Sequence, residues 1–140
     1  MKRILVCLLA AAALAAPSLA LASGGTASLR TTMTGRTAVP RGAKRGRGTV
    51  TIRVSGSRVC WTFGRLHGID KPRAAFLRHG IPGEFGPVVV QLGKRYRASG
   101  CARTTVATAQ QIALSPRAYY VTVNTRRFPL GAVRGQLRRA

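Results

Sequence analysis

Apolar and polar residues alternate along several short stretches of this chain, which is the pattern of half-buried β-strands. In residues 49–55, valine and isoleucine alternate with threonine and arginine, so one face of a strand is expected to be buried and the other exposed. After a Ser-Gly-Ser turn, residues 59–63 alternate again and predict the second strand of a hairpin. Residues 88–92 form a continuous apolar run, which predicts a strand buried on both faces.

The other strand-like stretches are rich in threonine, β-branched and aromatic residues, and glycine, proline and serine separate them. Strands are predicted at 27–34, 49–55, 59–63, 74–77, 88–92, 119–125 and 132–137. Residues 107–114 are the one predicted helix, with Thr108 as its N-cap and Pro116 just beyond its end. Seven short strands joined by turns predict an all-β antiparallel domain, either a sandwich or a barrel.

The first 22 residues have the three parts of a secretory signal peptide. Lys2 and Arg3 form a positive start, residues 4–16 form an uninterrupted apolar run, and an Ala-x-Ala cleavage motif ends at Ala22. The apolar run is short for a transmembrane helix, although an uncleaved membrane anchor is the alternative. The sequence therefore predicts a secreted, extracytoplasmic protein whose mature part, 23–140, is one domain with no transmembrane segment.

Export decides how the cysteines are interpreted. Cys7 leaves with the signal peptide, and Cys60 and Cys101 remain as an even pair in an oxidising compartment. We therefore predict a disulfide bond between them, worth about 4 kcal/mol for the loop of about 40 residues that it closes. A redox-active or catalytic thiol is the alternative, and the absence of a C-x-x-C motif disfavours it.

The charge is strongly basic, with 24 Lys and Arg residues against two acids, Asp70 and Glu84, and a formal net charge of +22. This balance excludes acidic calcium-binding modules, and two-carboxylate hydrolysis would require the only two acids to meet in one cleft. Four cations gather in the Gly-rich stretch 39–48, namely Arg41, Lys44, Arg45 and Arg47.

Arginine binds phosphate and carboxylate groups through two parallel hydrogen bonds. The basic stretch therefore predicts contact with an anionic cell-envelope polymer or another extracellular polyanion. Aromatic residues make up only 6% of the chain and are largely used by the predicted strands, so we expect no base-stacking platform and no specific nucleic-acid target. The alternative is that the charge reflects an Arg-rich composition and a solvated surface.

Other candidate sites are weaker. His67, Asp70, His79 and Glu84 could form a metal cluster, but their spacing matches no ligand motif, and we predict no metal, no cofactor and no catalytic residue. A Ser-His-acid hydrolase would need a nucleophile-elbow motif, which the sequence lacks. Arg134 has two interpretations: an outward-facing side chain, or a structural arginine, partly buried and paired with Glu84 or Asp70.

The order of motifs resembles the CHRD domain, a module named after chordin, over about residues 27–137. The motifs are Val59-Cys60-Trp61, Ala74-Ala75, Gly80-x-Pro-Gly-Glu-x-Gly-Pro-Val-Val-Val, Gly100-Cys101, Pro116-x-x-Tyr-Tyr-Val and Phe128-Pro129-x-Gly-x-Val-Arg-Gly-Gln-Leu. The resemblance implies an antiparallel Greek-key β-sandwich of immunoglobulin-like or superoxide-dismutase-like form, an extracytoplasmic location and no established enzymatic activity.

The departures from the family pattern bear on function. The resemblance implies histidines at the positions that Phe76, Arg78 and Asn124 occupy here. His79 cannot simply replace the second of them, because adjacent side chains on a strand point to opposite faces. We therefore predict a non-enzymatic binding or structural module, for which a protein partner is also possible. The alternative is a metal-dependent, superoxide-dismutase-like or redox function, which needs three converging ligands.

Overall fold

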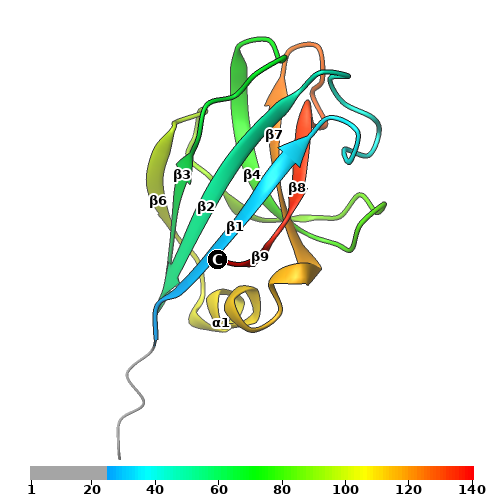
Figure 1. Cartoon of the computed structure of the whole chain (residues 1–140). Helices are drawn as coiled ribbons and strands as arrows, with labels where there is room; N and C mark the ends of the chain where they lie inside the picture. Colours follow the sequence, from blue (N-terminus) through cyan, green and yellow to red (C-terminus); the bar gives the residue numbers. More distant parts are fainter. Residues whose placement is uncertain (1–24) are drawn as a thin grey trace, which may run out of the picture.

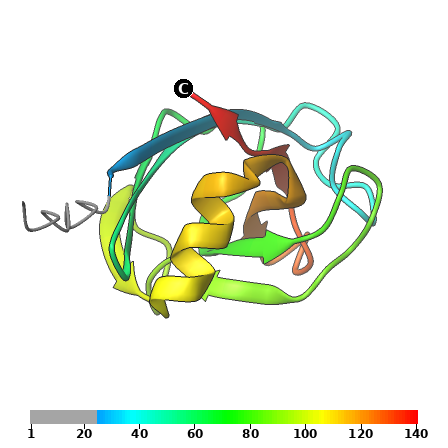
Figure 2. The ribbon, with the colours of Figure 1, turned by 90° about the horizontal axis from the view of Figure 1, so that it is seen from below.

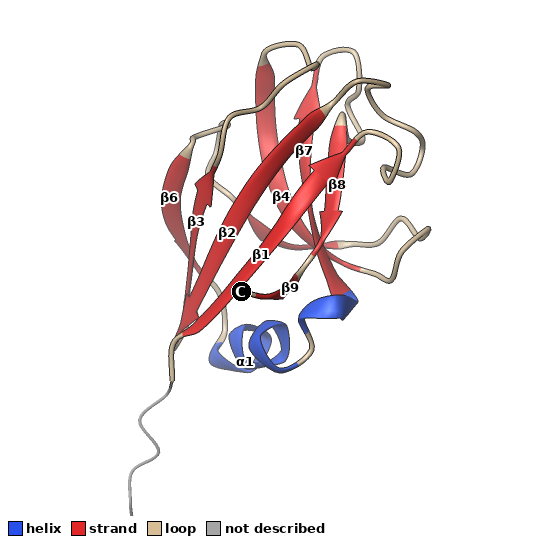
Figure 3. Ribbon diagram, viewed as in Figure 1, coloured by secondary structure: helices blue, strands red, loops and turns tan. Residues whose placement is uncertain are grey.

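Antiparallel strands are the main secondary structure of residues 25–140, which are the residues that the computed structural model describes (Figures 1 and 3). The predicted signal peptide, 1–22, lies outside the described residues. The strands are β1 (Ala27–Thr34), β2 (Arg47–Ser55), β3 (Arg58–Phe63), β4 (Pro72–His79), β5 (Val88–Gln91), β6 (Ser99–Arg103), β7 (Tyr119–Thr125), β8 (Val133–Gln136) and β9 (Arg138–Arg139). The helical elements are α1 (Val106–Leu114) and the short 3₁₀ turn η1 (Pro116–Ala118).

The strands form one antiparallel sheet, with the order β5-β4-β7-β8-β1-β2-β3-β6 and with β9 paired to β1. The sheet curls until its two edge strands, β5 and β6, approach each other, and Figure 2 shows the resulting ring with α1 lying across one end. The fold is therefore a nearly closed barrel and not clearly the two-sheet sandwich expected from the resemblance. Alternation predicts which face of a strand is buried, but it does not predict which strands pair.

The segment that connects β5 to β6, residues 92–98, covers the gap between the two edges. Its Tyr96 N–H donates to the carbonyl of Arg73 on β4 at 2.8 Å, and its Ala98 carbonyl accepts from the Phe63 N–H on β3 at 2.7 Å. The indole N–H of Trp61 donates to the carbonyl of Arg97 in the same segment at 3.0 Å. Residues 92–98 thus link β4 to β3 across the gap between the two edge strands.

The core fills the barrel with the apolar face of nearly every strand. Buried side chains with no solvent exposure include Leu29, Met33, Ile52, Leu77 and Val121. Trp61 packs against Gly100 of β6 so closely that a Cβ there would lie 2.6 Å from the indole ring. Helix α1 contributes the buried Ala109 and Ile112 to the core. It closes the end of the barrel that faces the reader in Figure 2.

Several predicted elements need correction. The N-cap of α1 is Thr105, whose hydroxyl accepts from the Thr108 N–H at 3.0 Å, so the prediction of Thr108 as the cap is wrong. Strand β5 was predicted to be buried on both faces, but it is an edge strand in which Val88 is 44% exposed. The strand that is buried on both faces is β7, all of whose residues are buried. Strand β6 was not predicted because its sequence, SGCAR, has no bulky apolar residue.

Candidate functional site

Four connections meet at the end of the barrel that lies at the top of Figure 1, and we call this the loop end. They are residues 35–46, 64–71, 92–98 and 126–132. The Ala43 N–H donates to the carbonyl of Ala132 at 2.8 Å, which joins the first connection to the last. Arg47 and His67 exchange backbone hydrogen bonds of 2.9 and 2.8 Å, which anchors the second connection beside β2. The four connections therefore form one surface.

Basic side chains gather on this surface. All eleven Lys and Arg residues of the four connections are exposed. The first two connections carry Arg36, Arg41, Lys44, Arg45, Arg65 and Lys71. The other two carry Lys94, Arg95, Arg97, Arg126 and Arg127. Among the described residues, the opposite end of the barrel carries five such side chains: Arg58 and Arg103, at the ends of β3 and β6, and Arg117, Arg138 and Arg139. The charge is thus concentrated at one end.

The predicted polyanion-binding residues Arg41, Lys44, Arg45 and Arg47 are all exposed at the loop end. Arg41 and Lys44 line a hollow of about 560 Å³ together with Arg36. Arg45 and Arg47 are not among its lining residues. The structure therefore brings two of the four predicted residues to one hollow and adds Arg36, which lies outside the Gly-rich stretch.

Two glycines shape the first connection. A Cβ at Gly35 would lie 1.8 Å from the carbonyl oxygen of Ala43, and one at Gly42 would lie 2.2 Å from that of Ala132. Real side chains cannot occupy those positions without moving the backbone. The Gly-rich composition of this stretch thus packs the backbone tightly against 126–132, and it fixes where Arg41 and Lys44 lie.

A larger hollow of about 800 Å³ lies between the other connections, and the sequence analysis did not find it. Four cations from three separate segments line it: Lys71 and Arg73, Arg95, and Arg126. Tyr96 also lines it, and burial raises the pKa of the Tyr96 hydroxyl. No local spacing could have revealed this group, since only the pairing of 92–98 with β4 brings its members together.

Arg134 is buried inside the protein, at 2% exposure. Its Nη2 donates to the carbonyl of Ile81 at 2.8 Å, its Nη1 donates to the carbonyl of Glu84, and the guanidinium lies 3.5 Å from the centroid of the Tyr120 ring. Burial lowers the pKa of Arg134, while the nearby Tyr120 and Glu84 oppose that effect. Of the two interpretations of Arg134, the geometry matches the inward one. The hydrogen-bond partner at Glu84 is the main-chain carbonyl, not the carboxylate expected from the sequence.

Two further side chains hold the same loop, residues 80–87. Gln136 Nε2 donates to the carbonyls of Gly80 and Arg117 at 2.6 and 2.7 Å. Arg78 Nη1 donates to the carbonyl of Gly86 at 2.9 Å, with its guanidinium 4.6 Å from the centroid of the Phe85 ring. The Arg-Gly-Gln motif at 134–136 therefore fastens the loop between β4 and β5 to the barrel.

The three positions at which the resemblance implies histidines, those of Phe76, Arg78 and Asn124, share one face of the sheet. Asn124 on β7 pairs with Ala74 on β4, and Phe76 and Arg78 follow on β4 at alternate positions. A phenyl ring and a guanidinium do not ligate metals, and Asn124 Nδ2 donates to the carbonyl of Pro129 at 2.7 Å. The residues present at these three positions do not fit a metal ion.

The other candidate ligands are also separated. His67 and Asp70 lie in the connection 64–71 at the loop end, whereas His79 ends β4 at the opposite end and Glu84 lies in the loop beyond it. Within residues 25–140 no group of three His, Cys, Asp or Glu side chains is close enough to hold a metal ion. The four-residue metal cluster considered from the sequence does not form.

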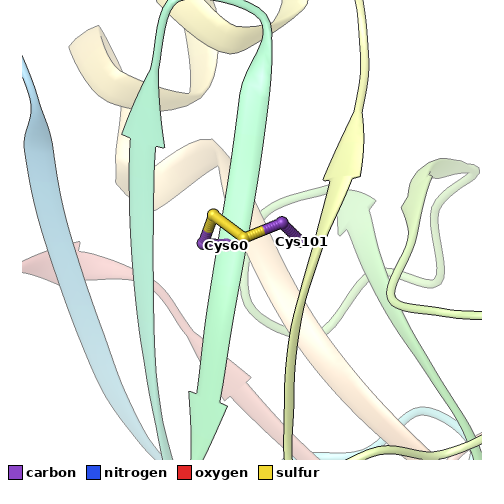
Figure 4. The surroundings of a disulfide bond; sticks show 2 residues. All are labelled: Cys60 and Cys101. Carbon is purple, nitrogen blue, oxygen red and sulfur yellow. A yellow bond between two sulfur atoms is a disulfide. The ribbon is translucent and has the colours of Figure 1, made fainter.

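The predicted disulfide is confirmed. Cys60 on β3 and Cys101 on β6 are direct partners in the sheet, with their Cα atoms 4.0 Å apart, and they are bonded across a separation of 41 residues (Figure 4). Cys101 is exposed, so the bond lies on the outside of the barrel. It ties the edge strand β6, which has little apolar surface of its own, to its neighbour.

The sequence model of the CHRD domain matches residues 29–137, which is most of the chain. The chain belongs to the CHRD domain family, whose function is unknown. No curated protein and no solved structure matches it significantly. None of the helices in the described part of the chain has the length and apolar character needed to cross a membrane.

Proposed function

We propose that this protein is a non-enzymatic, extracytoplasmic binding module whose loop end contacts an anionic polymer of the cell envelope. The supporting observation is the uneven distribution of charge among the described residues: eleven exposed cations on four connections at one end of the barrel, and five at the other end. Segments at both ends are exposed to solvent, so an Arg-rich composition alone would place similar numbers of cations at the two ends.

So many neighbouring cations destabilise the fold, which supports a binding role for this arrangement. Like charges repel one another and destabilise the compact state. Asp70 is the one acidic side chain on the four connections, so little of this repulsion is relieved from within. A bound polyanion removes the repulsion and releases its own counterions, and binding of this kind is strong at low salt and weak at high salt.

Export is part of the proposal. The Cys60–Cys101 disulfide is stable in an oxidising compartment and is rare in a reducing one. The N-terminal residues have the sequence of a signal peptide. An exported basic protein meets the anionic polymers of the envelope before it meets nucleic acid, which is why we favour an envelope polymer as the partner.

The test is co-sedimentation of the mature protein with isolated envelope across a salt series. The loop variant carries Arg41→Gln, Lys44→Gln, Arg45→Gln and Arg47→Gln. A matched control removes the same charge from the outer face of the sheet by Arg30→Gln, Arg53→Gln, Arg58→Gln and Arg103→Gln, all of them exposed strand residues. Unfolding followed by Trp61 fluorescence establishes that both variants are folded.

We expect the wild-type protein to sediment with the envelope at low salt and to be released as salt rises. The loop variant should be released at lower salt than the sheet-face control. Equal release of the two variants would mean that net charge, not the loop end, controls binding. No sedimentation of the wild-type protein at low salt would contradict the proposed function.

A further inference from the structure

We infer that the hollows of the loop end form one continuous basic groove, and that this groove holds a single linear polyanion chain with a charge on each repeat. The inference rests on the proposed function and adds where the chain lies and what shape of ligand is bound. An isolated anion would occupy one hollow, whereas a linear polymer would occupy the whole groove.

Shared lining residues show that the hollows are neighbours. The hollow at Arg41 shares Gly42 and Lys44 with a smaller hollow of about 270 Å³. That middle hollow shares Asp70 with the larger hollow of about 800 Å³. The three hollows therefore follow one another across the loop end, from the first connection to the segment 92–98.

Cations line the groove along its whole length. Arg36 and Arg41 lie at one end, and Lys44 and Arg127 lie in the middle. Lys71, Arg73, Arg95 and Arg126 surround the large hollow at the other end. Six of these eight side chains are arginines, whose planar guanidinium can bind an anionic group through two hydrogen bonds. A chain with regularly spaced charges satisfies them all, while a compact anion reaches only a few.

The segment 92–98, which lines the large hollow, is held on two sides. Its Tyr96 packs against Phe63 of β3, with ring centroids 5.3 Å apart, and the Tyr96 N–H donates to the carbonyl of Arg73 on β4. Of the cations around the hollow, Arg95 thus lies on a segment that is held from both sides, and Arg73 lies on the strand that holds it. Preorganised contacts lose less entropy on binding, so we expect the large hollow to bind short chains and the rest of the groove to add affinity for long ones.

Asp70 stands at the junction between the middle and the large hollow. A carboxylate there repels a chain that passes between the two hollows, but it affects a short chain in the large hollow less. Asp70→Asn should therefore raise the affinity for a long chain by about threefold, the scale of one exposed charge interaction.

The experiment measures binding of inorganic polyphosphate of graded length to the mature protein, with tripolyphosphate as the short probe. The groove variant carries Lys71→Gln, Arg73→Gln, Arg95→Gln and Arg126→Gln; the loop variant and the sheet-face control described above each lose the same charge. The logarithm of affinity should fall with the logarithm of salt concentration by about 0.7 per neutralised phosphate. The slope for long chains should therefore be about −5 to −6 for the wild-type protein and the control, and about −3 for the groove variant.

We expect affinity to rise steeply with chain length in the wild-type protein. The groove variant should lose binding of the short probe, and the loop variant should keep it but lose most of the gain from length. If tripolyphosphate binds as tightly as long chains, or the groove variant behaves like the sheet-face control, the continuous groove is wrong. If the wild-type protein binds none of the probes at low salt, the proposed function fails as well.

A single-stranded DNA of equal charge gives a further control. The groove recognises charge and spacing, so DNA should bind no more tightly than polyphosphate. Markedly tighter binding of DNA would mean that bases are recognised and would overturn the assignment of the groove to a simple charged chain.

Discussion

Arg134 offers the sharpest test of how this fold is held together, because it is a buried cation that donates to the main-chain carbonyls of Ile81 and Glu84 and to the side-chain oxygen of Gln136. Replacing it with methionine keeps most of the side-chain volume but removes the donors to Ile81 and Glu84 and the contact with Tyr120. A hydrogen bond from a charged donor contributes about 1.5–3 kcal/mol, and a desolvated cation–π contact contributes about 2 kcal/mol.

Two effects reduce the sum of these contributions. Removing Arg134 also removes the cost of burying a cation, which is visible in the lowered pKa of its guanidinium. In addition, Ile81 and Glu84 lie in an exposed loop, where water can bind the freed carbonyls. We therefore expect Arg134→Met to lower the free energy of unfolding by about 3 kcal/mol, within the range measured for broken buried networks.

The assay is urea unfolding of the oxidised protein followed by the fluorescence of Trp61, the single tryptophan, which is 3% exposed. Arg138→Met, at an exposed position two residues from Gln136, is the matched control and should change stability by less than about 0.5 kcal/mol. An Arg134→Met protein as stable as this control would refute the reasoning.

Proteolysis gives a local readout of the same change. Glu84 is the only glutamate in the chain, so a protease specific for glutamate cuts once, in the loop that Arg134 holds. The two fragments stay joined by the Cys60–Cys101 disulfide and separate only on a reducing gel. Cleavage at Glu84 should be faster in Arg134→Met than in the wild-type protein at a temperature where both are folded. Equal cleavage rates would mean that Arg134 does not hold the loop.

Three further predictions follow from the structure. Replacing Cys60 and Cys101 with serine should lower the free energy of unfolding by about 4 kcal/mol, which urea unfolding measures; no loss would show that the bond adds nothing to stability. Gly42→Ala places a Cβ 2.2 Å from the Ala132 carbonyl oxygen, so it should lower both the melting temperature and the affinity for polyanion, and unchanged values would contradict the tight packing of this loop. Burial raises the pKa of Tyr96 and Tyr119 above the ordinary value of 10.0. As pH rises, these two hydroxyls therefore ionise in the unfolded chain before they ionise in the folded protein. The stability that their burial contributes is complete below pH 10 and is lost as pH rises through the folded-state pKa. Urea unfolding at pH 8 and at pH 11 should show the loss, and Phe at both positions should reduce it.

Local patterns in the sequence were enough for much of the fold. The strict alternation at 49–55 predicts a strand that is now part of β2, and the two cysteines of the mature chain predict the disulfide. They were not enough for β6, because the strand SGCAR is held by pairing with β3 and by the disulfide and has no apolar pattern of its own. The link across the gap in the barrel depends in the same way on hydrogen bonds from 92–98 to β4 and β3, which no local pattern encodes.

In the candidate site, too, local sequence patterns predict some residues and not others. Arg41 and Lys44 were found because they are close in sequence, in a stretch whose glycines mark a tight turn. Arg73 and Arg95 were missed because only the fold brings them to one hollow. The sequence suggested that Arg134 could be structural, but two of its hydrogen-bond partners are backbone carbonyls, at Ile81 and Glu84, and a carbonyl partner has no signal in the sequence. Contacts between distant segments and contacts to the main chain are therefore what the structure adds.

The most direct test of the account is a map of where a polyanion touches the protein. We would label the mature protein with ¹⁵N and follow its amide resonances while a long polyphosphate is added at moderate salt. If the polymer lies in the groove of the loop end, the largest shifts lie in 35–46, 64–73, 94–97 and 126–127, with small shifts around Arg53, Arg58 and Arg103 on the sheet face. Shifts of similar size around all exposed arginines would contradict it, because they would show that the polymer follows net charge and not the loop end.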